Sequence, residues 1–144
     1  MLCDIKNQLD CPHVQNLIMA SAWDQSETTT NKKIAQWRTG QDLCLYGWVA
    51  EGVVLGVCGI VLTTTHIEIV NIAVAPHMRK QGIGYAMIMA LRQKYPLPIK
   101  AETDDDAVDF YKKCGFEIKG IIKQYGEVAC QRYHCTLPLI NASL

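Results

Sequence analysis

The sequence has no excess of charge of either sign, and this balance excludes one group of functions. Its 144 residues include 14 Lys and Arg against 14 Asp and Glu, so the formal net charge is +0. A protein that holds nucleic acid or an anionic membrane through its overall field needs a basic surplus. We therefore expect no nucleic-acid partner and no membrane partner. A small local basic site is compatible with this balance.

The sequence also lacks the cysteine spacing of disulfide frameworks and zinc sites. It has seven cysteines, an odd number, and no two of them form a Cys-x-x-Cys pair. No signal-peptide pattern precedes Cys3. These features favour a reducing, cytoplasmic location, with most cysteines acting as small apolar core residues. We expect no metal site, and the group of Cys130, His134 and Cys135 is the place to check for one.

An uninterrupted hydrophobic run of membrane-spanning length is missing too. Residues 43–62 are nearly all apolar, but Glu51 and Gly52 divide the run at its centre. A two-residue turn between two apolar halves is typical of a β-hairpin. We therefore predict a hairpin here in place of a membrane helix.

The segment 79–84 (Arg-Lys-Gln-Gly-Ile-Gly) lacks the residues of two common phosphate-binding motifs. Tyr85 follows Gly84 where a P-loop has Lys-Ser or Lys-Thr, and Met87 stands where a dinucleotide fingerprint has its third glycine. The segment nevertheless joins an apolar strand pattern to a helix pattern. A helix N-terminus preceded by glycines, with Arg79 and Lys80 beside it, is suited to bind a diphosphate.

Hydrophobic periodicity predicts a single domain over residues 1–144, of the α/β (α+β) class, with helices on both faces of a mixed sheet. Capping and turn residues set the expected boundaries. The expected elements are strands at 2–5, 43–50, 53–62, 66–74, 97–103, 116–122 and 133–137, helices at 12–23, 31–39, 82–95 and from Asp104 to Gly115, and a loop at 24–30.

An arginine-x-x-glycine-x-glycine turn is also how acyl-coenzyme A binders hold their ligand, and residues 79–84 fit this turn without a gap. With residues 69–76 before it and 107–116 after it, the chain resembles the GNAT superfamily of N-acetyltransferases. The resemblance is specific over residues 67–120 and weaker from residue 43 to the end. It implies a mostly antiparallel GNAT-like sheet, acetyl-coenzyme A as co-substrate, and direct attack of a primary amine on the thioester. The acceptor would be a small molecule or a peptide, and homodimers are common in the family.

The resemblance implies a cofactor site built largely from backbone. The end of the strand would pair with the pantetheine arm, an N–H near Val74 would polarise the thioester, and the glycine turn would hold the diphosphate. The family often has asparagine at the position of Asp104, and an ionised carboxylate can only accept hydrogen bonds. The predicted cofactor-binding residues are Ile72, Ala73, Val74, Arg79, Lys80, Gln81, Gly82, Ile83, Gly84, Tyr85 and Asp104.

Two residues are predicted to be catalytic. Strand alternation puts Glu68 on the face of Val70 and Ile72. A carboxylate within an apolar strand indicates a base for the amine, a counter-ion for it, or an exposed edge residue; His66 is an alternative base. Tyr111 is the predicted proton donor to the coenzyme A sulfur, and the alternative is a core tyrosine at helical spacing.

The acceptor site is expected among the first helices, their loop and the closing strands. Aromatic and acidic residues there would suit a cationic amine, although most of these aromatics can equally be core residues. Two rival functions stay open: a non-catalytic acyl-coenzyme A sensor of the same fold, and a protein that binds ATP or NAD. The acceptor-site candidates are Trp23, Asp24, Glu27, Trp37, Tyr46, Trp48, Tyr125 and Tyr133.

Overall fold

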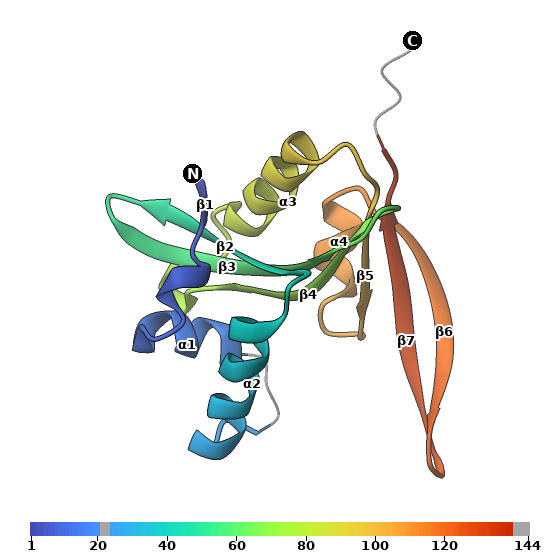
Figure 1. The fold of residues 1–144 in the computed structure, drawn as a ribbon. Coiled ribbons are helices and arrows are strands. Elements are labelled where there is room, and N and C mark those ends of the chain that lie inside the picture. Colours follow the sequence, from blue (N-terminus) through green and yellow to red (C-terminus); the bar gives the residue numbers. More distant parts are fainter. Residues whose placement is uncertain (21–23, 140–144) are drawn as a thin grey trace.

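The computed structural model describes residues 1–20 and 24–139, and it forms one seven-stranded sheet covered by helices on both faces (Figure 1). The strand order is β1-β2-β3-β4-β5-β7-β6, and every neighbouring pair is antiparallel except β4–β5. The predicted fold class is therefore confirmed. The elements are β1 (Leu2–Asp4), α1 (Pro12–Met19), α2 (Glu27–Thr39), β2 (Leu43–Ala50), β3 (Val53–Leu62), β4 (Ile67–Val74), α3 (Ile83–Lys94), β5 (Ile99–Thr103), α4 (Val108–Lys113), β6 (Glu117–Tyr125) and β7 (Val128–Leu137), with short 3-10 turns at Lys6–Gln8 and Pro76–Met78.

The predicted β2–β3 hairpin has the predicted bounds. Its two turn residues, Glu51 and Gly52, have φ angles of 52° and 78°. Positive φ at both central residues is the geometry of the two-residue turn that matches the twist of paired strands. Among the described residues, no helix is long and apolar enough to cross a membrane.

The second helix begins four residues earlier than the sequence pattern predicts. The Ser26 side chain accepts a hydrogen bond from the backbone N–H of Thr29, and Asp24 accepts bonds from the Ser26 N–H and the Thr29 hydroxyl. These caps start α2 at Glu27 within the segment expected to be a loop, because polar N-cap side chains satisfy the free N–H groups of the first turn. Helix α1 ends at Met19, and the remainder of its predicted length, from residue 21, lies outside the described residues.

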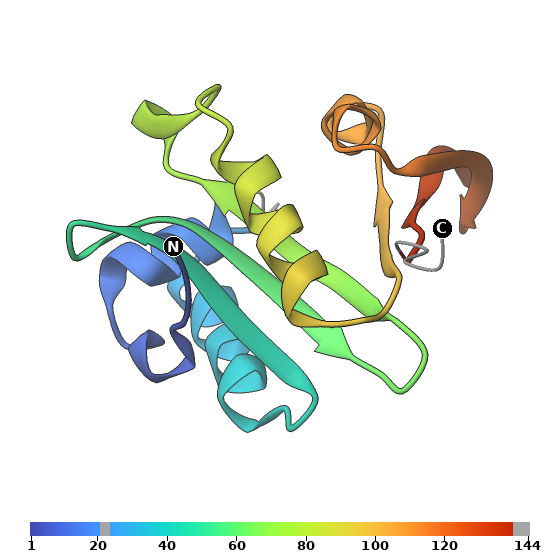
Figure 2. The ribbon, with the colours of Figure 1, turned by 90° about the horizontal axis from the view of Figure 1, so that it is seen from above.

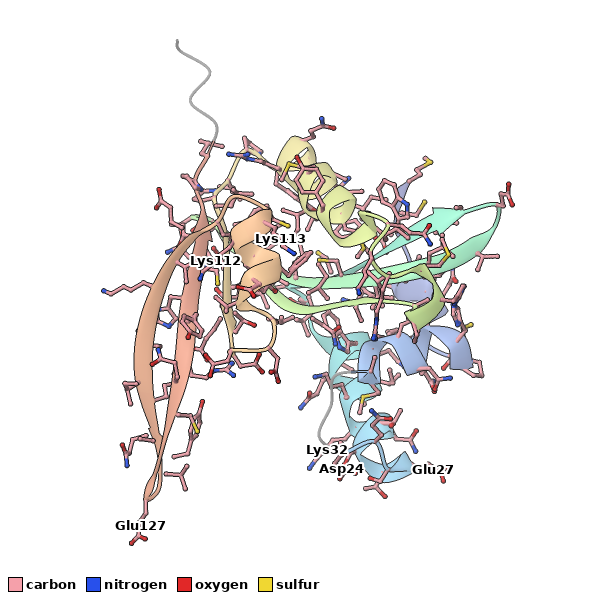
Figure 3. The ribbon with its side chains drawn as sticks, turned by 180° about the vertical axis from the view of Figure 1, so that it is seen from behind. Asp24, Glu27, Lys32, Lys112, Lys113 and Glu127 are labelled. Carbon is pink, nitrogen blue, oxygen red and sulfur yellow. The ribbon has the colours of Figure 1, made fainter. Side chains whose placement is uncertain are left out.

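Helix α4 begins at Val108, so Asp104 does not cap it as predicted. The Asp104 carboxylate instead accepts the N–H groups of Asp106 and Ala107, at 3.0 and 3.1 Å, and closes a turn before the helix. Strands β6 and β7 are longer than expected. They form a hairpin that projects from the body of the sheet, with Glu127 at its tip (Figure 3).

The sheet separates two apolar core clusters. One lies under α3 and α4 and contains Met87, Leu91 and Tyr111; the other lies under α1 and α2 and contains Leu17 and Trp37. Burying apolar side chains on both faces is what holds such a layered domain together.

The α3–α4 cluster includes five ionisable side chains, none of which is more than 6% exposed: Cys58, Cys114, Cys135, Tyr46 and Tyr111. Burial disfavours their charged forms. It raises the pKa of the Cys58 thiol to about 12 and that of the Cys114 thiol to about 11. Burial also raises the pKa of the Cys135 thiol and is the main cause of the raised pKa of the Tyr46 and Tyr111 phenols, so all five groups are neutral at neutral pH.

We predict that this chain loses stability at alkaline pH. The unfolded chain releases these protons from about pH 9 for the thiols, while the folded chain keeps them. The unfolded state then binds fewer protons, so the free energy of unfolding falls as pH rises, by up to about 1.4 kcal/mol per pH unit for each group. Thermal melts between pH 7 and 11 will show this fall. Cys58→Val should make it shallower, and an equally steep fall in that variant would contradict the assignment.

Candidate functional site

The site is organised around a gap between β4 and β5. The two strands pair only at Ile67–Ile99, Glu68–Lys100 and Ile69–Ala101, although β4 continues to Val74 and β5 to Thr103. Figure 2 shows β5 diverging from β4 on the side of α3 that faces α4. Beyond Ile69, none of the described strands pairs with this edge of β4. Backbone N–H and C=O groups there are available to a ligand.

A cavity of about 650 Å³ occupies this region. It is bounded by the end of β4, by the turn before α3 together with the first residues of α3, and by α4. Its volume lies within the range of cavities that hold small molecules and cofactors. Of the predicted cofactor-binding residues, the cavity brings together Ile72, Ala73, Val74, Arg79, Lys80, Gly82, Ile83, Gly84 and Tyr85.

The turn before α3 has the geometry that an anion site needs. Gly82 precedes the helix with φ of 80°, and a Cβ built on it would find no atom within 4 Å. Lys80 is also left-handed, with φ of 65°, a conformation that costs energy for a residue other than glycine. No side chain in the described part of the chain caps α3, so its first N–H groups remain available to a ligand at the positive end of the helix dipole.

Gly84 has a different role from the one its motif suggests. A Cβ on Gly84 would lie 2.7 Å from the Phe110 ring, so the missing side chain makes room for α4 beside α3. Close packing of these two helices narrows the cavity. A contact between a diphosphate and the Gly84 N–H stays a prediction.

Tyr111 projects from α4 into the wall of the cavity. It is 4% exposed, and the Phe110 and Phe116 rings pack edge-on against it at centroid distances of 5.1 and 5.2 Å. Within the described part of the chain, its hydroxyl has no hydrogen-bond partner. Since the raised pKa keeps this phenol protonated, it can donate its proton to a group in the cavity.

Other predicted cofactor residues lie outside the cavity wall. Gln81 and Asp104 do not line it. Arg79 does line it, and its Nε donates to the Val74 carbonyl at 3.3 Å, which holds the guanidinium against the end of β4. Sequence reasoning missed Lys113, which lines the cavity from the last turn of α4, whereas its neighbour Lys112 does not (Figure 3). It also missed Ala20 and Met78, for which the sequence gives no signal.

Glu68 lies in a second cavity, of about 320 Å³, with His66, Lys100, Glu102 and His134. The Glu68 Oε2 is 3.3 Å from the His66 Nε2, and the Glu68 side chain is 38% exposed. Along β4, the segment from Glu68, which lines the smaller cavity, to Ile72, which lines the larger one, is only five residues long. The two predicted bases therefore contact each other and lie beside the cofactor cavity, not in it.

The predicted face of Glu68 is wrong in one respect. Val70 has no partner in β3, because Gly59 pairs with Asn71 and Ile60 pairs with Ile69. One extra residue in a strand reverses the alternation beyond it. Ile72 therefore packs on the α3 face, and Glu68 shares its face with Asn71.

Glu102 on β5 joins the closing hairpin to the sheet. Its carboxylate lies 2.7 Å from Lys123 and 3.3 Å from both Arg132 and His134. The Lys123 hydrogen bond is the main cause of its lowered pKa, so Glu102 is ionised at neutral pH.

In the described ranges, no cluster of His, Cys, Asp or Glu could hold a metal ion, and this includes the region of Cys130 and Cys135.

Most acceptor-site candidates lie away from both cavities. Trp37 and Tyr46 are core residues, and the Tyr46 hydroxyl bonds the Tyr95 hydroxyl. Tyr133 donates to Asp105. Trp48 packs against the core, Asp24 and Glu27 start α2, Tyr125 is exposed on the hairpin, and Trp23 lies outside the described residues.

Comparison with known proteins gives a consistent result. A curated N-acetyltransferase of uncharacterised role from Bacillus methanolicus, encoded 3′ of lysA, is 35% identical over 80 residues, which are 55% of this chain and 66% of that protein. An aminoglycoside 6′-N-acetyltransferase solved with coenzyme A superposes with a TM-score of 0.78 at 14% identity, covering 98% of both chains. The Escherichia coli ribosomal-protein-S18-alanine N-acetyltransferase superposes with a TM-score of 0.73 at 18% identity, covering 100% of this chain and 97% of that one.

The match to a family model decides the classification. The model of the acetyltransferase (GNAT) family matches residues 9–116, which include the glycine turn, the β4–β5 gap and α4. These are the same elements that form the larger cavity. This chain therefore belongs to the GNAT acetyltransferase family.

Proposed function

We propose that this chain is an acetyl-coenzyme A-dependent N-acetyltransferase that transfers the acetyl group to a primary amine by direct attack on the thioester. The cavity in the β4–β5 gap carries the proposal. It is lined by a glycine turn at a helix N-terminus, by the end of β4 beyond its pairing with β5, and by a buried tyrosine. Membership of the family supports the same reaction.

The turn from Arg79 to Gly84 would bind the diphosphate of coenzyme A. Its first helical N–H groups supply hydrogen bonds, and Lys80 adds a positive charge beside them. The open position at Gly82 admits the diphosphate next to the backbone. The free edge of β4 at Ile72–Val74 would accept the pantetheine arm as a strand accepts a neighbour, and an N–H there would polarise the thioester carbonyl.

Two side chains would move protons. Glu68 would take a proton from the incoming ammonium, directly or through His66 or water, since only the neutral amine attacks. When the C–N bond forms and the C–S bond breaks, the departing thiolate would take the proton of the Tyr111 hydroxyl. Tyr111 suits this role because burial keeps it protonated.

The choice of acceptors to test comes from the names of the solved neighbours. The solved neighbours named above act, by their names, on an aminoglycoside and on an alanine of ribosomal protein S18. Both acceptors offer a primary amine. We therefore use kanamycin and a hexapeptide that begins with alanine as the first two probes.

The first test is ligand binding. We expect acetyl-coenzyme A, and neither ATP nor NAD, to raise the melting temperature by several degrees, because a ligand at about 100 times its Kd adds roughly 2.7 kcal/mol. Mass spectrometry of kanamycin and the hexapeptide after incubation then detects acetyl transfer. Binding without transfer to any amine tested would favour the sensor, and a shift with ATP or NAD alone would contradict the proposal.

Tyr111→Phe tests the proton donor. We expect kcat to fall about 100-fold, within the usual range for a lost general acid, while the Kd of acetyl-coenzyme A changes less than about twofold. Tyr46→Phe is the matched control, since Tyr46 is a buried tyrosine outside the cavity. Normal turnover by the Tyr111 variant would show that its hydroxyl has only a packing role.

Glu68→Gln tests the base. We expect kcat/KM to fall about 100-fold at pH 7 and to recover as pH rises toward the pKa of the amine, because the variant must wait for an already neutral amine. Lys100→Gln, in the register position opposite Glu68, is the control. Parallel pH profiles in Glu68→Gln and the unmodified chain would remove Glu68 from the mechanism.

A further inference from the structure

Asn71 carries a buried polar atom that the fold leaves unused. In residues 1–20 and 24–139, the buried polar side chains are Asn71, at 8% exposed, and Thr103. The Asn71 Nδ2 donates to the Ile18 carbonyl at 2.8 Å, whereas no donor in the described residues reaches its Oδ1. A buried acceptor without a donor is costly, so its presence calls for a partner.

The orientation of this amide is fixed by chemistry. The Ile18 carbonyl can only accept, so turning the Asn71 amide over would place two oxygens against each other. Ile18 also lies in the last turn of α1, where carbonyls have no partner within the helix. The Nδ2 group is therefore committed to α1, and Oδ1 is held as a hydrogen-bond acceptor on the other side of the amide.

Asn71 lines neither cavity itself, but its neighbours along β4 line both. It follows the unpaired Val70, so its side chain shares a face of β4 with Glu68, which lines the smaller cavity. The next two residues, Ile72 and Ala73, line the larger cavity, as does Ala20, two residues beyond Ile18. β5 has already left β4 at this level. An amine held at Glu68 and a thioester held at the Ile72–Val74 edge would therefore lie on either side of Asn71 along β4.

We propose that the Asn71 Oδ1 binds the nitrogen of the acceptor and selects primary amines. This inference rests on the proposed acetyl transfer. A primary ammonium has three N–H groups. One proton goes to Glu68 before attack, and a second is released after the C–N bond forms, replacing the proton that Tyr111 gives to the sulfur. The third N–H stays in the product amide, and this is the one that donates to Asn71.

The proton count explains the selectivity. A secondary ammonium has two N–H groups, and both leave during the reaction, so no N–H remains for Asn71. An alcohol has one O–H group, which is lost on acylation. A secondary amine still has one N–H while it attacks, but it must lose this N–H for the amide to form. Only a primary amine keeps an N–H for Asn71 through both C–N bond formation and C–S bond cleavage, where an interaction lowers the barrier.

The test compares two stable conjugates of coenzyme A by calorimetry. In the amide conjugate the coenzyme A sulfur carries CH2–C(=O)–NH–CH3, and in the ester conjugate it carries CH2–C(=O)–O–CH3. The two therefore differ only in the N–H group that is proposed to donate to Asn71. We expect the amide conjugate to bind on the order of tenfold more tightly than the ester, the worth of one hydrogen bond to an otherwise unpaired acceptor. Asn71→Leu should abolish this difference and leave the Kd of the ester conjugate unchanged.

Gln15→Leu is the matched control. The Gln15 amide donates to the Leu9 carbonyl at 2.8 Å, so this variant also removes a side-chain amide bonded to a backbone carbonyl, away from both cavities. It should keep the amide preference. Equal affinities in the unmodified chain would overturn the inference, even if Asn71→Leu failed to fold, and so would an Asn71→Leu variant that weakened both conjugates equally. Failure of both conjugates to bind would instead overturn coenzyme A binding itself.

Discussion

The short parallel pairing between β4 and β5 is the constraint on which the site depends. It joins two half-sheets, β1–β4 and β5-β7-β6, through three register pairs that end at Ile69 and Ala101. The extra residue at Val70 bends β4 just beyond this seam, as bulges do. On the far side, β5 stays paired with β7 up to Thr103. The sheet is therefore continuous at one end and open at the other.

The open end must be held open, and the α3–α4 core does this. Tyr111, Cys114 and Phe116 belong to the same buried cluster as Met87 and Leu91 of α3. α4 packs against α3 at Gly84, where any side chain would meet the Phe110 ring. This α3–α4 core is apolar and close-packed, and a close-packed core resists movement of β5 and α4 into the gap beside β4. The same burial keeps Tyr111 protonated, so one packing arrangement sets both the shape of the cavity and the charge state of its tyrosine.

In the other half-sheet, charged side chains join the β6–β7 hairpin to β5, whereas the inner residues Ile99, Cys135 and Leu137 belong to the α3–α4 core cluster. The outer parts of β6 and β7 are largely exposed, with Ile122 and Val128 more than half accessible. Glu102 receives Lys123, Arg132 and His134 from this hairpin. Each such pair near the surface is worth little alone, and a network of three around one carboxylate orients the hairpin more than it stabilises it. This places cationic groups beside the cavity that contains Glu68.

The sequence could predict features whose cause is local. The β2–β3 hairpin follows from Glu51 and Gly52, and the anion turn follows from two glycines between a strand pattern and a helix pattern. Features that depend on distant partners could not be predicted. The bulge at Val70 is such a feature, because the register with β3 sets it. The turn at Asp104 and the caps around Ser26 are local, but each lies in a run of polar residues that offers several positions for a helix to begin, and the prediction chose the wrong one. Because the bulge turns Ile72 to the other face of β4, the sequence-based prediction named the wrong neighbour for Glu68 on its face: Ile72 in place of Asn71.

Asn71 shows why the fold and the chemistry have to be considered together. An apolar residue would fill its buried position at lower cost, since every buried polar atom must regain the hydrogen bonds it loses to water. The Nδ2 bond to Ile18 accounts for half of the side chain, because it satisfies a carbonyl at the end of α1. A serine or threonine hydroxyl could supply a single donor of that kind. What these side chains lack is an amide's second polar atom, fixed in direction by the first. The part of Asn71 that the fold does not use is therefore an oriented acceptor, placed along β4 between Glu68 and the residues that line the larger cavity.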